Sequence, residues 1–231
     1  MDFLESKYLY FYLMLFTMAY PLAQSFEHRL TYYKNWTRLF MGIAAMMLLF
    51  IPWDIYFTHQ GVWWFNDKYI SGIKFLLLPL EEWLFFILVP FACIFIYEVL
   101  EYFFKKDVLK SLARPAFLVM GIGLGIGSLI YSDRQYTFVT FALTAVALLI
   151  AFILNPSWKG RFLLMYLVCW LPFLLVNGAL TGSFTFEAVV NYNPSEIIGL
   201  RIFTIPVEDS IYNMLMLIMV TAIYKFKKKS A

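Results

Sequence analysis

The sequence predicts an all-α fold: a polytopic membrane bundle of about seven transmembrane helices. Of the 231 residues, 62% are hydrophobic and only 14% are charged, against about 25% charged residues in ordinary globular domains. A water-soluble domain of this length could not bury so much apolar surface. The apolar residues also fall into seven runs, each near the roughly 20 residues that a helix needs to cross a bilayer. An internal repeat places three of these runs in each half of the chain and one between the halves.

The seven runs are expected to be helices, because irregular backbone cannot face lipid. The first run leads directly into the charged segment Glu27–Arg38, as a first span would, and is therefore not interpreted as a cleavable signal. The expected spans are Tyr8–Ala23, Leu39–Phe57, Leu76–Tyr97, Pro115–Tyr131, Thr137–Leu154, Phe162–Leu180 and Thr204–Tyr224.

The distribution of basic residues predicts the orientation in the membrane, because cytoplasmic loops carry an excess of Lys and Arg. Thirteen of the 18 basic residues follow the first, third, fifth and seventh spans, and five lie on the opposite side. The C-terminus is therefore expected in the cytoplasm and the N-terminus outside. The segment after the last span contributes Lys225, Lys227, Lys228 and Lys229 to this bias.

Composition also excludes several classes of protein. The net charge is +3 and most basic residues lie in short segments between apolar runs, so no binding of nucleic acid is expected. The two cysteines, Cys93 and Cys169, lie inside apolar runs, which excludes a disulfide scaffold. His28 and His59 lie on opposite sides of the membrane without a third ligand, so no metal site is predicted. The sequence contains no dinucleotide or flavin motif, and no cofactor is predicted.

The internal repeat aligns residues 66–82 with residues 193–209 without a gap. Asn, Ile, Gly, Pro and Glu are identical at matched positions, and Lys/Arg and Glu/Asp are chemically equivalent there. The third span matches the seventh, and a shift of four crossings preserves direction, so the repeats are parallel. The expected domains are a first repeat (1–110), a connector transmembrane helix (111–134) and a second repeat (135–231). A pseudo-two-fold axis along the membrane normal would bring matched residues to one depth.

Each repeat carries two adjacent acids at the outer end of a span: Glu81 and Glu82 in the first, Glu208 and Asp209 in the second. Acids at a helix N-terminus can simply complement the helix dipole. Ionisable side chains next to hydrocarbon are nevertheless a functional hypothesis by default. Neighbouring helical residues point about 100° apart, so one member of each pair is expected to face inward. Glu81 and Glu208 are the expected inward members, because Glu occupies that position in both repeats.

Other polar residues near the same end of the spans complete the candidate site. Asp54, near the outer end of the second span, is a further acidic candidate. The corresponding part of the sixth span carries Asn177, a polar but non-acidic counterpart. Asn66 and Asn193 are expected to hold turn backbone.

These motifs resemble the paired motifs of the lycopene cyclase domain. The resemblance is carried by residues 79–86 and 206–213, by Trp53 and Asp54 with residues 61–66, and by residues 177–182. It covers nearly the whole chain and is closest to the fused two-domain forms. It implies cyclisation of the forty-carbon polyene lycopene to β-carotene through γ-carotene, without net redox change. The implied protein is an isomerase-type cyclase that forms a carbon–carbon bond, in a bacterial or archaeal cell membrane.

This chemistry matches the acidic residues. A proton is added to an end-group double bond, a neighbouring double bond attacks the cation, and a proton is lost, so the site needs an acid, a base and a cavity without water. Two neighbouring carboxyl groups can share one proton. The candidate catalytic residues are Glu81, Glu82, Glu208, Asp209 and Asp54.

Aromatic faces would stabilise the cation by about 0.5–2 kcal/mol each. The candidate substrate contacts are Trp63, Trp83, Phe85, Phe86, Asn177 and Tyr212. The implied partners are lycopene, its cyclic products and the lipid bilayer. The resemblance is also compatible with association with other carotenoid enzymes. The sequence leaves open whether one composite site or two sites exist, and which carboxyl group is acid and which is base.

The main alternative is a membrane transporter or proton-coupled carrier, which also combines repeats with intramembrane acids. A carrier would be expected to place its acids at broken helices near mid-membrane, whereas these acids lie at span ends. A retinal protein needs a Lys inside the last span, and Ile205–Tyr224 contains none. A prenyl-diphosphate enzyme would need denser Asp clusters for Mg²⁺ and more basic residues.

Overall fold

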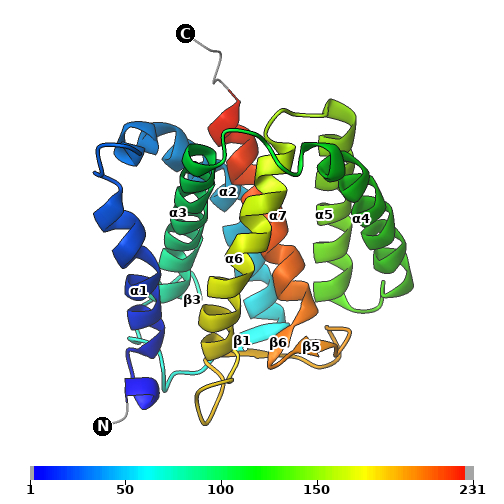
Figure 1. Ribbon diagram of the computed structural model, residues 1–231. Helices are drawn as coiled ribbons and strands as arrows, with labels where there is room; N and C mark the ends of the chain where they lie inside the picture. Colours follow the sequence, from blue (N-terminus) through cyan, green and yellow to red (C-terminus); the bar gives the residue numbers. More distant parts are fainter. Residues whose placement is uncertain (1–2, 227–231) are drawn as a thin grey trace.

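The computed structural model describes residues 3–226 and is mostly helical, with six short strands in this range. Six α-helices in this range, α2 to α7, are long and apolar enough to cross a membrane, and the first α-helix adds 16 residues. Figure 1 shows all seven running alongside one another. This confirms the predicted polytopic helical bundle. The helices are η1 (Phe3–Glu5), α1 (Leu9–Gln24), η2 (Tyr32–Asn35), α2 (Trp36–Gln60), α3 (Leu80–Phe103), α4 (Lys110–Ile130), α5 (Gln135–Leu154), α6 (Lys159–Leu180) and α7 (Val207–Lys225).

Large apolar side chains cover the outside of the bundle, as expected for a surface in contact with lipid. Leu48, Leu129 and Ile153 are between 72% and 81% exposed, although each lies within a long helix. The chain is therefore a multi-pass membrane protein. Lys227, Lys228 and Lys229 lie outside the described residues, and a cytoplasmic C-terminus stays a prediction.

Two helices begin later than the apolar runs predict. The spans expected from Leu76 and Thr204 begin as α3 and α7 only after Pro79 and Pro206, which stand directly before the helices. The preceding apolar residues form short hairpins instead, since a short apolar run does not distinguish a strand from a helix. The strands are β2 (Lys74–Phe75) with β3 (Leu78–Pro79), and β5 (Arg201–Ile202) with β6 (Ile205–Pro206).

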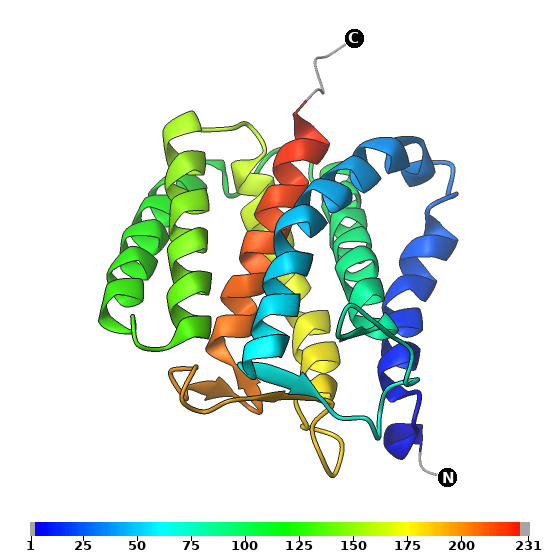
Figure 2. The same ribbon diagram turned by 180° about the vertical axis from the view of Figure 1, so that it is seen from behind.

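The two halves interlock around a pseudo-two-fold axis. Helix α1 packs against α3 as α5 packs against α7, while α2 packs against α7 and α6 against α3. Figure 2 shows α2 and α7 crossing side by side through the centre of the bundle. Strands β1 (Trp63–Phe65) and β4 (Val190–Tyr192) pair antiparallel, with Trp64 opposite its repeat counterpart Asn191. The local two-fold axis therefore passes through this strand pair.

Gly42 offers a test of the α2–α7 contact. A Cβ atom at Gly42 would lie 3.0 Å from the backbone oxygen of Val220 in α7, whereas a Cβ at Gly123 in α4 would meet nothing within 4 Å. We expect Gly42→Ala to destabilise the protein by about 1–3 kcal/mol, because overpacking separates the two helices. Gly123→Ala should be neutral or stabilising by up to about 1 kcal/mol, because Ala favours helix. Thermal unfolding of the purified proteins in detergent measures both, and equal melting temperatures would contradict the contact.

Candidate functional site

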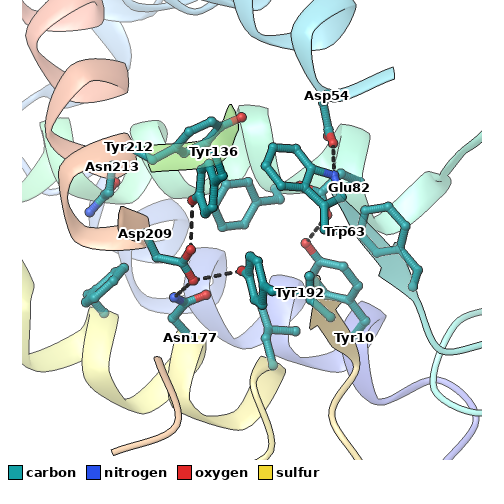
Figure 3. A pocket seen from close by; sticks show the side chains of 15 residues that line it. Tyr10, Asp54, Trp63, Glu82, Tyr136, Asn177, Tyr192, Asp209, Tyr212 and Asn213 are labelled. Carbon is teal, nitrogen blue, oxygen red and sulfur yellow. Dashed lines mark hydrogen bonds between the residues drawn. The ribbon is translucent and has the colours of Figure 1, made fainter. Parts of the chain in front are cut away.

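A cavity lies at the end of the bundle that carries the short strands, and both halves of the chain line it. Six helices contribute through residues near their ends: α2 and α6 through their last turns, and α1, α3, α5 and α7 through their first turns (Figures 1 and 3). The first half contributes Tyr10, Asp54, Trp63, Phe65, Glu82 and Phe85. The second half contributes Tyr136, Phe173, Asn177, Leu180, Val190, Tyr192, Asp209, Tyr212 and Asn213.

Glu82 is the carboxyl group that the first repeat presents to the cavity. It lies in the first turn of α3, and Tyr10 of the neighbouring α1 donates its hydroxyl hydrogen to Oε2 at 2.6 Å. Among the described residues, no group forms a hydrogen bond with the second oxygen, Oε1. One oxygen of Glu82 is thus fixed by the protein and the other is available to a molecule in the cavity.

Asp209, the repeat counterpart of Glu82, is held much more firmly. Its Oδ1 accepts a hydrogen bond from the Tyr136 hydroxyl at 2.7 Å, and its Oδ2 accepts bonds from Asn177 and Tyr192, both at 2.8 Å (Figure 3). Burial raises the pKa of Tyr192 in strand β4 well above its ordinary value, and the nearby Asp209 carboxyl adds to this shift. Tyr192 therefore stays protonated and remains a donor to Asp209.

Glu81 and Glu208 point away from the cavity, opposite to the orientation expected from the sequence. Both are fully buried, and in each one Oε1 accepts a backbone N–H at 2.7 Å, from Ser71 and from Ile198. The two N–H groups are themselves repeat counterparts. Glu208 also accepts a hydrogen bond from the Thr137 hydroxyl at 2.7 Å. These two acids tie the turn before each hairpin to the start of the following helix.

Asp54 lies at the cavity as predicted, near the end of α2. It is 1% exposed, and the indole N–H of Trp63 donates to its Oδ1 at 2.7 Å. Its second oxygen, Oδ2, is buried without a hydrogen-bond partner among the described residues. Asn177, expected as the counterpart of Asp54 in the sixth span, is instead a donor to Asp209.

Four of the six expected substrate contacts line the cavity: Trp63, Phe85, Asn177 and Tyr212. The other two lie elsewhere because adjacent helical positions point in different directions. Trp83 donates its indole N–H to the backbone carbonyl of Phe75 at 3.2 Å, and its ring packs against the Phe75 ring in the first hairpin. Phe86 is fully buried in the bundle core.

An aromatic wall connects the two carboxyl groups. The rings of Tyr136 and Tyr192 are stacked 5.8 Å apart, and Trp63 contacts Tyr136 edge-on at 5.0 Å. Figure 3 shows these rings between Asp209 on one side and Glu82 with Asp54 on the other. Tyr212 completes the wall with its ring 6.3 Å from Trp63. The wall offers aromatic faces to any positive charge that forms between the carboxyl groups.

Sequence reasoning missed the three tyrosine donors. Tyr10 and Tyr136 lie near the starts of the first helices of their repeats, and each donates to the second acid of its own motif. At the offset of 127 residues Tyr10 falls opposite Thr137, one position from Tyr136, so the repeat register alone does not pair the two tyrosines. Tyr192 aligns with Phe65, so only its hydroxyl distinguishes the two positions.

The turn asparagines behave as predicted. Asn66 Oδ1 accepts the backbone N–H of Lys68 at 3.0 Å, and Asn193 Oδ1 accepts that of Ser195 at 3.1 Å. Each bond closes the turn that leads to a hairpin, which fixes the path between the first strand of each half and the acidic helix start.

Comparison with known proteins agrees with the repeated architecture. The family model described as lycopene cyclase matches residues 7–100 and again residues 133–227. No curated protein and no solved structure matches the chain. The two matched regions together cover most of the sequence and contain both acidic motifs. This chain, a multi-pass membrane protein with one cavity shared by two repeats, belongs to the lycopene cyclase family and is an enzyme of that family.

Proposed function

We propose that the protein is a lycopene β-cyclase, which converts the two linear end groups of lycopene into β-rings through γ-carotene. The observation that carries the proposal is the shared cavity, which brings Glu82 and Asp209 from opposite halves into one aromatic-lined space. The reaction is an isomerisation by acid and base. It requires no electron transfer, so the proposal includes no cofactor.

The surroundings of the cavity support this chemistry. A carbocation in water would be trapped, and the largely apolar and aromatic lining of the cavity disfavours water beside it. The aromatic wall can stabilise the cation by about 0.5–2 kcal/mol for each ring face. A carboxyl group is a weak acid for an alkene, so this differential stabilisation of the transition state is essential.

One composite site would serve both ends of the substrate in turn. Glu82 and Asp209 are repeat counterparts, yet both line the same cavity. A symmetric polyene could present one end group, leave as γ-carotene, and return with the other end. The monocyclic product is then an obligatory intermediate.

The geometry favours a cyclase over a proton-coupled carrier. A carrier is expected to use acids at discontinuous helices near the bilayer midplane. Glu82 and Asp209 instead lie in the first turns of α3 and α7, at one end of the bundle.

Pigment analysis of a cell that accumulates lycopene tests the proposal. Expression of this chain alone should convert lycopene to β-carotene, with γ-carotene appearing first. Membranes incubated with lycopene should do the same without added flavin or nicotinamide. Leu48→Ala, at an 81% exposed position on the outside of α2, is the matched control and should retain full conversion. The absence of any cyclic pigment with the native chain would refute the function.

A further inference from the structure

The two cavity carboxyl groups occupy equivalent positions in the repeat but have different surroundings. Asp209 accepts hydrogen bonds on both oxygens from Tyr136, Asn177 and Tyr192. Glu82 accepts one, from Tyr10, on Oε2 alone. Hydrogen bonds donated to a carboxylate favour its charged form, so the three donors favour an ionised Asp209. An ionised carboxylate has about four acceptor sites, which leaves a lone pair of Asp209 free to take a proton.

The surroundings of Glu82 favour the opposite state. Glu82 shares the cavity with Asp209, and no Lys or Arg side chain lines the cavity within the described part of the chain. Two buried carboxyl groups that lie close together cannot both ionise readily. The remaining oxygen of Glu82, Oε1, has no partner in residues 3–226, so a proton on it can point at a substrate.

We propose that the two repeats have divided the acid–base work, with Glu82 as the proton donor and Asp209 as the proton acceptor. This assignment rests on the proposed cyclase function. It explains why Asp209 has three donors where Glu82 has one.

The reaction balances without another reactant. The proton of Glu82 forms a C–H bond with the terminal double bond of the end group, whose other carbon becomes the cation. The electron pair of a nearby double bond attacks that cation, closes the six-membered ring and moves the positive charge to a ring carbon. Asp209 removes a proton from the adjacent ring carbon, and the released pair becomes the ring double bond. Substrate and product are isomers, and the proton now on Asp209 returns to Glu82 before the next turnover.

The two roles predict different failures in a lycopene-producing cell. Glu82→Gln cannot donate the proton, so all cyclic products should fall by at least about a hundredfold. Asp209→Asn keeps the donor but loses the acceptor, so the cation still forms and loses its proton elsewhere. We expect rings with the double bond at other positions, or, in membranes incubated in D₂O, recovered lycopene that contains deuterium in its end groups. Glu82→Gln should produce neither.

Tyr192→Phe provides a milder variant that keeps the aromatic stack. Removing one of three donors should shift the ratio of ring types while total cyclisation stays within about threefold of the native chain. Comparable protein levels and melting temperatures control for folding. The assignment is overturned if Asp209→Asn yields only unlabelled lycopene or normal β-rings, or if Glu82→Gln yields misplaced double bonds. Failure of the native chain to cyclise lycopene would instead refute the proposed function itself.

Discussion

Replacing Lys225 with Glu is expected to be among the most destabilising single changes in this protein. Lys225 Nζ lies 2.7 Å from Glu101 Oε2 and 3.7 Å from Glu98 Oε1, and the Lys225 and Glu98 side chains are only 8% and 11% exposed. Loss of one partner of a buried ion pair costs about 3–5 kcal/mol. The 36% exposure of Glu101 reduces its share of this cost through solvent screening. Protein level in membranes and thermal unfolding in detergent measure the effect.

The repeat provides a control for this prediction. Extending the alignment places Tyr97 opposite Tyr224 and Glu98 opposite Lys225, so equivalent positions carry opposite charges where α3 approaches α7. The exchange Glu98→Lys with Lys225→Glu should restore much of the stability that Lys225→Glu removes. The stability of Lys225→Met should lie between that of Lys225→Glu and that of the double exchange, because Met places no negative charge beside the two glutamates. A melting temperature unchanged by Lys225→Glu would show that the pair contributes nothing.

Substitution of the fully buried acids Glu81 and Glu208 should separate a positioning role from proton transfer. Glu81→Gln and Glu208→Gln keep an oxygen that can accept the N–H of Ser71 or Ile198, so most cyclisation should survive. Glu81→Leu and Glu208→Leu remove the acceptor of that part-buried N–H, at a cost of about 1 kcal/mol each. The Leu variants should melt lower and lose activity as the turn beside Glu82 or Asp209 shifts.

Pigment ratios and melting temperatures together distinguish the outcomes. Loss of all cyclic product in Glu81→Gln, with the native melting temperature retained, would make Glu81 a proton carrier and contradict the positioning role. If Glu81→Gln keeps its cyclisation activity and Glu82→Gln loses it, the orientation of the two side chains in the structure is supported.

The amino-acid sequence by itself determined the class of the fold. Composition and run length require a helical membrane bundle, because so much apolar surface is stable only in lipid. The gapless match of residues 66–82 with 193–209 determined the repeat, and the paired acids with Asp54 predicted a candidate site at one end of the bundle. These features are local or periodic, so they can be detected without knowing which helices touch.

Only the tertiary structure decided which acid of each pair serves the cavity. The orientation of Glu82 relative to Glu81 depends on where α3 begins, and that start is set by a hairpin whose apolar strands are hidden in a continuous hydrophobic run. The donors to Asp209 come from α5, α6 and β4, which are far apart along the chain. Their convergence is a result of helix packing across the pseudo-two-fold axis. A one-dimensional pattern carries no information on such packing, because the partners of a buried side chain are chosen by the folded arrangement rather than by neighbouring residues.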